Sequence, residues 1–339
     1  MTRSSTKDQE RRVLRCVYDE SQFEVVATDE RPDFRLHRGG YRPFGVEVTE
    51  IFLSQPAARA ARIPGYVREL LDGATPRHKE DVAALKVESV QIHDPDGNLK
   101  AENVPAILQL KPPLNEYRGR LVDAISSKAL KRANYDHSLD HVNLIVRDHI
   151  ELLSANKRED FSRLVLDDSL KAAVLGSGYR EVFMVTQIDS ADVYVPLAML
   201  SLVAEAYMFG EVLARSDPDD ACDLANAISY AKLLAQFLHA RGFAPLLRLV
   251  GDEAEVLLGN TGLVLDKDRG LVIRDYADFP LPKAEPPPRP GNADWHLPDA
   301  ILAMYAQAQD ELEFVSSFVF DVLQSDKDNG PATHPVNSV

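Results

Sequence analysis

The stretch RPDFRLHRGGYRPFGVEVTEI, residues 31–51, carries the pattern from which the fold of this chain is inferred. Polar and apolar residues alternate on both sides of the turn signal at residues 38–40, which is typical of a β-hairpin. Because successive side chains of a strand point to opposite faces, Glu47 and Thr49 share one face of the second strand. The pairing of the two strands then places Asp33 beside Glu47. We therefore predict two neighbouring carboxylates on this hairpin.

Two carboxylates this close need a positive partner. At a separation of about 4 Å, two unit negative charges repel each other by about 4 kcal/mol when the effective dielectric constant is near 20. A shared proton or a bound cation removes this repulsion, and hard oxygen ligands favour Mg²⁺ or Mn²⁺. We predict that Asp33, Glu47 and the carbonyl oxygen of Val48 hold such an ion, which polarises a phosphate and lowers the pKa of a bound water.

The segments around the hairpin predict an α/β domain over residues 1–200. Helical spacing of apolar residues alternates along the chain with short runs of β-forming residues. About residues 52–116, which contain helical and hairpin patterns of their own, form an insertion. The expected elements are a helix at 8–20, strands at 23–28, 33–36 and 45–51, a helix at 118–135, a strand at 142–146, and two strands at 181–186 and 193–197.

The Pro32-Asp33 pair, the Glu47-Val48-Thr49 triplet and this αβββαβ order of elements resemble the PD-(D/E)XK nuclease superfamily, which has the restriction-endonuclease-like fold. The resemblance covers roughly residues 8–150. It implies a mixed sheet, a Mg²⁺ or Mn²⁺ ion held by Asp33 and Glu47, and hydrolysis of phosphodiester bonds, of DNA in preference to RNA.

The resemblance also implies helper residues around the metal. An auxiliary acid on the helix before the hairpin would be Glu10 or Glu20. Thr49 stands where the family has a lysine, and a threonine hydroxyl carries no charge to stabilise the transition state at phosphorus. In some nucleases of this resemblance the basic residue lies on the following helix, where Lys128 is the first candidate and Lys131 the second. The predicted catalytic residues are Asp33, Glu47, Thr49, Lys128 and Lys131.

The same helix region carries three arginines, Arg118, Arg120 and Arg132, which we expect to contact the phosphates of the nucleic-acid backbone. Each phosphate neutralised in this way steepens the salt dependence of binding. Considered alone, a row of basic residues on a helix is also typical of an ordinary solvated face.

The charge of the chain is divided unevenly. The formal net charge is −15, yet residues 1–150 hold 23 Lys and Arg against 23 Asp and Glu. The whole excess of acid therefore lies in residues 151–339, so the N-terminal half keeps the electrostatics that DNA binding requires. We predict an acidic accessory domain at 201–325, mostly helical with some strand, which repels non-cognate DNA or binds a basic protein, and a tail at 326–339.

Several other classes of protein find no support in the sequence. No P-loop, no GxSxG motif and no complete dinucleotide fingerprint occurs, and the two cysteines, Cys16 and Cys222, match no metal-ligand spacing. The start is polar and no run of about 18 apolar residues exists, so we predict a cytoplasmic protein without a membrane partner.

Three functions remain open at this point. The first is the nuclease, the second is a catalytically inactive interaction protein in which Thr49 marks lost chemistry, and the third is a small-molecule hydrolase that uses the same metal site. A nitrogen of Lys128 or Lys131 within about 5 Å of the Asp33 and Glu47 carboxylates favours an enzyme, whereas pairing of both lysines elsewhere favours the inactive protein. Monomer and homodimer both remain open.

Overall fold

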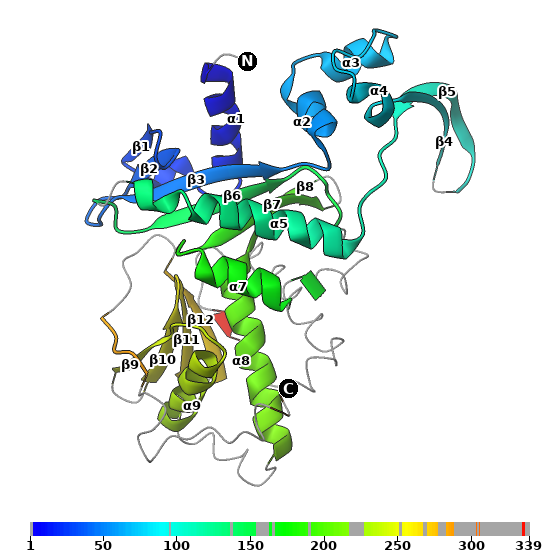
Figure 1. Cartoon of the computed structure of the whole chain (residues 1–339). Helices are drawn as coiled ribbons and strands as arrows, with labels where there is room; N and C mark the ends of the chain where they lie inside the picture. The colour runs from blue at the N-terminus through cyan, green and yellow to red at the C-terminus, as the bar shows by residue number, and fades with distance from the viewer. Residues whose placement is uncertain are drawn as a thin grey trace.

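The computed structural model contains a central sheet with helices on both of its faces, an insertion that projects to one side, and a second sheet formed late in the chain (Figure 1). Among the residues that the structure describes, no helix has the length and apolar character needed to cross a membrane. The described residues are 3–94, 96–135, 138–153, 163–164, 167–188, 191–216, 227–250, 253–266, 270–276, 283–287, 303, 305 and 334–335.

The central sheet has six strands in the order β1-β2-β3-β6-β7-β8. Strands β1, β2 and β3 are antiparallel neighbours, β3, β6 and β7 run parallel, and β8 is antiparallel to β7. The prediction of an α/β fold with a mixed sheet is thus confirmed. The bounds are β1(Val25–Thr28), β2(Phe34–His37), β3(Phe44–Ile51), β6(Val142–Asp148), β7(Val182–Ile188) and β8(Ala191–Pro196).

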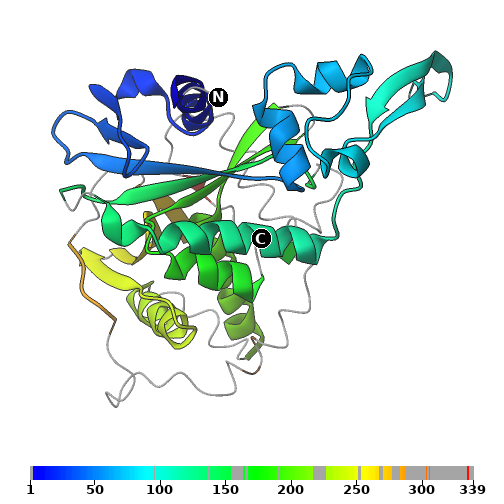
Figure 2. The same cartoon turned by 45° about the horizontal axis from the view of Figure 1, so that its top comes forward.

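Two helices cover opposite faces of this sheet. Figures 1 and 2 show α1(Arg3–Arg15) on one side and α5(Leu114–Ala129) on the other. The strand side chains alternate between these layers, and each large apolar side chain buried there contributes about 1.5–3 kcal/mol. The α1 side buries Val13, Leu14, Phe34, Val46, Val48 and Ile145, and the α5 side buries Leu121, Ile125, Leu144 and Val146.

Helix α1 differs from the predicted helix at 8–20. It begins at Arg3 and ends at Arg15, after which the chain turns so that Tyr18 is buried in the layer between α1 and the sheet. Asp19 then caps a short turn of 3-10 helix, η1(Glu20–Gln22), by accepting the backbone N–H of Ser21 at 2.9 Å. Because the helix ends early, Glu20 does not lie on it.

Helix α5 also ends earlier than predicted. It follows Pro113, whose ring suits a helix start, and stops at Ala129, with a 3-10 turn, η2(Arg132–Asn134), after it. The predicted helix to residue 135 was therefore too long. As a result Lys131 lies beyond the helix and does not continue the face that carries Lys128.

The segments between β3 and α5, where the insertion was predicted, project to one side of the central sheet (Figure 1). They have a small core of Tyr66, Leu70 and Leu85. Buried Asp81 accepts a hydrogen bond from the Tyr66 hydroxyl at 2.6 Å and pairs with Arg59 at 2.5 Å, so its charge is compensated. The insertion consists of α2(Gln55–Arg62), α3(Tyr66–Leu71), α4(Asp81–Ala84), β4(Val87–His93) and β5(Leu99–Ile107).

The later part of the chain contains more strand than the predicted, mostly helical module. Its sheet has the order β13-β12-β11-β10-β9. Gly259, with φ of +60°, lies in the tight turn between β10 and β11, where a positive φ favours glycine. The elements are α7(Asp168–Gly176), α8(Leu197–Ser216), α9(Ala227–Ala240), β9(Leu246–Val250), β10(Glu253–Leu258), β11(Thr261–Asp266), β12(Gly270–Asp275) and β13(His334–Pro335).

The predicted domain boundary at residue 200 falls inside α8. Buried residues on both sides of that position belong to one apolar core, which extends from α5 and β6 to α9 and β10. Much of the predicted accessory domain at 201–325 lies outside the described residues, as does the predicted tail at 326–339 apart from β13, which pairs with β12.

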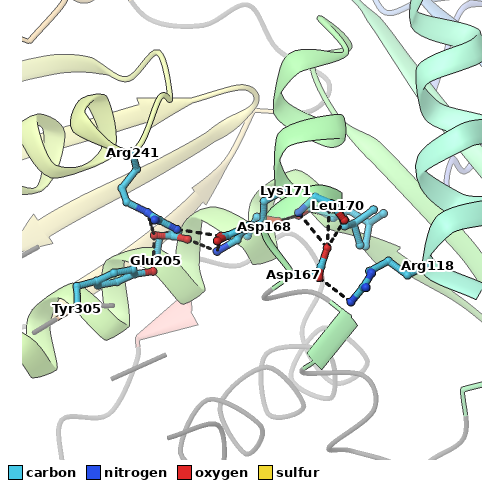
Figure 3. A network of polar contacts seen from close by, with 11 residues as sticks. Arg118, Asp167, Asp168, Leu170, Lys171, Glu205, Arg241 and Tyr305 are labelled. Atoms are coloured by element: carbon cyan, nitrogen blue, oxygen red, sulfur yellow. Dashed lines mark hydrogen bonds and ion pairs between the residues drawn. The ribbon is translucent and has the colours of Figure 1, made fainter. Parts of the chain in front are cut away.

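A buried ionic group, which we call the Lys171 network, joins α7, α8 and α9 (Figure 3). Its members are Asp168, Lys171, Glu205, Arg241 and Tyr305. Lys171 is 2% exposed and Glu205 is fully buried, and the two form an ion pair. Lys171 also lies 3.0 Å from Asp168, and Arg241 lies 2.9 Å from Asp168 and 3.5 Å from Glu205. Two cations thus balance two anions, of which Glu205 is buried and Asp168 is 65% exposed at the surface.

Candidate active site

Asp33 and Glu47 are brought together by the pairing of β2 with β3. Phe34 is opposite Val46 in the antiparallel register, so Asp33, directly before β2, comes next to β3 at Glu47 and Val48. The Asp33 carboxylate is fixed there, because its Oδ2 accepts the backbone N–H of Val48 at 3.0 Å. Glu47 is only 7% exposed, whereas Asp33 is half-buried.

Lys128 reaches the carboxylate of Glu47 from helix α5, which covers one face of the central sheet. It lies in the last turn of α5, and its Nζ is 2.5 Å from Glu47 Oε1 and 3.0 Å from the carbonyl oxygen of Val48. The distance is within the roughly 5 Å that favours an enzyme. The charge that Thr49 lacks is therefore present beside Glu47.

Lys7 approaches from α1, on the other face of the sheet. Its Nζ lies 2.7 Å from Asp33 Oδ1 and 2.9 Å from Glu10 Oε2. The sequence reasoning missed this residue, because the predicted helix began one position after it. A usable signal was present, since Lys7 and Glu10 are three residues apart and meet on one face of a helix.

These five residues, Lys7, Glu10, Asp33, Glu47 and Lys128, form one electrostatic unit that we call the carboxylate cluster. Burial, with the negative charge of Asp33, raises the pKa of Glu47, and Lys128 opposes this. Burial also raises the pKa of Glu10, where Asp33 adds to the rise and the two lysines oppose it. Three acids face two lysines, so the fully ionised cluster has one uncompensated negative charge.

Two buried oxygens of the cluster have no geometric hydrogen bond among the described residues: Glu10 Oε2, which lies 2.9 Å from the Lys7 ammonium, and Glu47 Oε2. The Tyr135 hydroxyl lies close enough to the Glu47 carboxylate to influence its pKa, and is 3.0 Å from the Tyr179 hydroxyl. Burial raises the pKa of Tyr179 to about 12 and raises that of Tyr135 as well, so both remain protonated. Neither tyrosine was a predicted site residue.

The donor set suits a hard divalent ion in kind, though it is small. Within the described part of the chain, no three His, Cys, Asp or Glu side chains are placed to hold one metal. Asp33, Glu47 and the Val48 carbonyl offer two carboxylates and one neutral oxygen, which is enough for Mg²⁺ because this ion keeps several waters. Lys7 and Lys128 contact all three groups, and the Tyr135 hydroxyl also lies beside the Glu47 carboxylate.

The other predicted site residues lie apart from the acids or are paired. Glu20 forms ion pairs with Arg11 at 2.8 Å and Arg15 at 3.2 Å, and the hydrogen bond from Arg11 lowers its pKa to about 2. Glu10, not Glu20, is the acid of α1 that belongs to the cluster. Thr49 follows Glu47 on the same face of β3 and is half-buried.

Of the predicted phosphate-binding arginines, two are engaged in ion pairs. Arg118 lies 2.6 Å from Asp167, and Arg120 lies 2.7 Å from Glu116. Arg132 is exposed and its guanidinium packs against the backbone of Gly178, near Tyr179. Lys131 is exposed just beyond α5. Of these four residues, Lys131 and Arg132 are the exposed ones, and Arg132 lies beside Tyr179.

No protein-family model matches the chain, and neither a curated protein nor a solved structure shows significant similarity to it. The carboxylate cluster is therefore the basis of the function proposed below.

Proposed function

We propose that this protein is a metal-dependent nuclease of the PD-(D/E)XK type, built on an αβββαβ core, that hydrolyses phosphodiester bonds of DNA. The observation that carries the proposal is the position of Lys128. Its Nζ lies 2.5 Å from Glu47 Oε1, although 81 residues separate the two in the chain. A lysine on the helix after the insertion supplies the cation that the Glu47-Val48-Thr49 triplet lacks.

The proposed roles follow from the atoms that each residue presents. Asp33 Oδ1, the Glu47 carboxylate and the Val48 carbonyl would hold Mg²⁺ or Mn²⁺, which when bound activates a water and polarises the scissile phosphate. The Lys128 ammonium, on its flexible stem, turns from Val48 toward the phosphate and stabilises the charge that develops at phosphorus. Glu10 acts as the auxiliary acid that holds Lys7, and the Thr49 hydroxyl lines the site.

The residues that we propose to contact the phosphates differ from the three arginines predicted from the sequence. Arg118 and Arg120 are engaged by Asp167 and Glu116, whereas Lys131 and Arg132 are exposed just beyond the end of α5. We therefore assign the backbone contacts first to Lys131 and Arg132. The choice of DNA over RNA follows from the resemblance alone, so both belong in the test.

Magnesium-dependent cleavage tests the proposal. Supercoiled plasmid, single-stranded DNA and RNA are incubated with the wild type, Asp33→Ala and Glu47→Ala, each with Mg²⁺ and with EDTA. We expect cutting by the wild type with Mg²⁺ only, and a loss of at least about 100-fold in both variants. Glu20→Ala is the matched control, because it removes an acid outside the cluster and should cut normally. Equal cutting by all four proteins would refute the assignment.

A second candidate is the catalytically inactive interaction protein. The observation that favours it is that ammonium groups already contact Asp33, Glu47 and the Val48 carbonyl. In that case Lys7 and Lys128 are structural counter-ions, and the acidic residues of the C-terminal half bind a basic partner. Absence of cleavage together with absence of Mn²⁺ binding would favour this alternative, and would also exclude the small-molecule hydrolase that needs the same metal.

A further inference from the structure

Asp33 has a single oxygen to offer a metal. Its Oδ2 is already occupied, because it accepts the backbone N–H of Val48 at 3.0 Å and so ties the residue to β3. Its Oδ1 is contacted at 2.7 Å by the ammonium of Lys7. A cation that binds Asp33 through Oδ1 meets the Lys7 ammonium there, and the repulsion between two positive charges at one oxygen favours displacement of Lys7.

Lys7 has a second partner, which lowers the free-energy cost of such a displacement. Glu10, one helical turn further along α1, lies 2.9 Å from the same ammonium. When Lys7 leaves Asp33 it therefore remains paired, because its flexible four-carbon stem allows the ammonium to stay on Glu10. Lys7 and Glu10 are both partly exposed, with side chains 27% and 22% accessible, so the movement needs no opening of the core.

The contrast with Lys128 separates the two lysines by function. The Lys128 ammonium has Glu47 and the Val48 carbonyl as its partners, and both belong to the proposed metal site. Lys7 alone has a partner, Glu10, outside the three ligand groups. Lys7 is thus placed to alternate between Asp33, which is a proposed metal ligand, and Glu10, which is not.

We propose that Lys7 is a positioning residue that competes with the divalent ion for Asp33. It holds the Asp33 carboxylate in place while no ion is bound, and passes to Glu10 when the ion takes Oδ1. The affinity of the site for the metal is therefore set in part by Lys7. The inference depends on the metal site of the proposed function, but it concerns binding of the ion and not the cleavage reaction.

Mn²⁺ binding to the full chain, measured in the absence of nucleic acid by the electron paramagnetic resonance signal of free Mn²⁺, tests this role. Removing the competing cation in Lys7→Met should tighten Mn²⁺ binding by about five- to tenfold. Lys7→Arg keeps a cation on Asp33 and should bind Mn²⁺ like the wild type. Lys100→Met, on the exposed ribbon of the insertion, is the matched control and should change nothing.

The second arm examines the other partner. In Glu10→Gln the displaced Lys7 loses its alternative partner, so we expect Mn²⁺ to bind more weakly, by about threefold. A Lys7 that only stabilises the fold would not tighten Mn²⁺ binding when it is replaced by methionine. Lys7→Gln repeats the first arm if Lys7→Met does not fold, as judged by its circular dichroism spectrum.

Three results would overturn the inference. Equal or weaker Mn²⁺ binding in Lys7→Met than in the wild type rejects the competition but leaves the proposed nuclease intact. Binding that persists unchanged in Asp33→Asn places the ion elsewhere and rejects both proposals. Absence of Mn²⁺ binding in the wild type and in Lys7→Met alike also rejects both.

Discussion

The carboxylate cluster and the Lys171 network are both groups of acids and cations, yet they differ in what is left uncompensated. In the network, Lys171 and Arg241 balance Asp168 and Glu205, and the central pair is 2% and 0% exposed. In the cluster, three acids face two lysines, which leaves one negative charge without a counter-ion. The cluster also includes a backbone carbonyl as a neutral oxygen.

This difference distinguishes a group of charges that can bind a divalent ion from one that only stabilises the fold. A lysine next to a glutamate is not in itself a sign of chemistry, because the Lys171 network contains one and satisfies its charges internally (Figure 3). An excess of acid and access from the surface are what a divalent ion needs. The two groups should therefore respond in opposite ways to removal of their lysine.

The largest effect is expected in the network. Lys171→Met leaves Glu205 without its nearest cation in the interior, and breaking a buried ion pair in this way costs about 3–5 kcal/mol of unfolding free energy. Urea denaturation of the purified protein measures it. Mn²⁺ binding by the folded fraction should stay normal. A loss of unfolding free energy of less than about 1 kcal/mol would show that the Lys171 network does not stabilise the fold.

Lys128→Met should have the reverse profile. We expect cleavage to fall by about 100- to 1000-fold, because the charge that stabilises the developing negative charge at phosphorus is gone. The midpoint of urea denaturation should change less than in Lys171→Met, because burial and Asp33 already raise the pKa of Glu47, so that this carboxylate can take up a proton once Lys128 is gone. Retained cleavage with lost stability would reverse the contrast between the two groups.

Glu181 extends the comparison, because it is a buried acid with no ion pair among the described residues. Its carboxylate accepts backbone N–H groups from Val182, Ala198 and Met199 at 2.8, 2.7 and 3.1 Å. Burial nevertheless raises its pKa from 4.5 to about 8, against the opposing effect of these amides. The folded protein then binds the proton more strongly than the unfolded chain, so this contribution to stability falls as the pH rises from about 4.5 to about 8.

The measurement is the melting temperature of the wild type and of Glu181→Gln between pH 5 and pH 9. Relative to the variant, the wild type should lose stability as the pH rises through this window, at roughly 1.4 kcal/mol for each pKa unit of the shift. Parallel curves for the two proteins would show that Glu181 does not titrate in this way.

The smallest effect is expected at Glu20, whose carboxylate is paired with arginines near the surface. Its pKa is lowered to about 2, so its stabilising contribution is present above about pH 4.5 and disappears as the pH falls toward 2. Because the pair is largely solvated, Glu20→Ala should cost only about 0.2–1 kcal/mol at pH 7, and the two proteins should converge in acid. Chemical denaturation at pH 7 and pH 3 compares them.

The sequence predicted those parts of the site that depend on local periodicity. The strand period placed Glu47 and Thr49 on one face, and the turn residues at 38–40 fixed the hairpin that carries Asp33. Lys128 was also a candidate from its place on the helix after the insertion. These positions needed only the spacing of residues within single elements.

The parts that depend on element ends and tertiary contacts could not be read from the sequence. Lys7 was missed and Glu20 was considered because α1 begins and ends five residues earlier than its apolar pattern indicated. Lys131 lies outside α5, because this helix ends at Ala129. The pairing of Arg118 with Asp167 joins α5 to the cap of α7, which no local pattern reveals.

The claim on which the account rests is that Asp33, Glu47 and the Val48 carbonyl hold a divalent ion. The most direct test is an anomalous difference map from crystals soaked in Mn²⁺. We predict one peak at about 2.0–2.3 Å from Asp33 Oδ1, a Glu47 oxygen and the Val48 carbonyl oxygen, with Lys7 turned toward Glu10. A map with Mn²⁺ bound elsewhere, and both lysines still on their carboxylates, would contradict it.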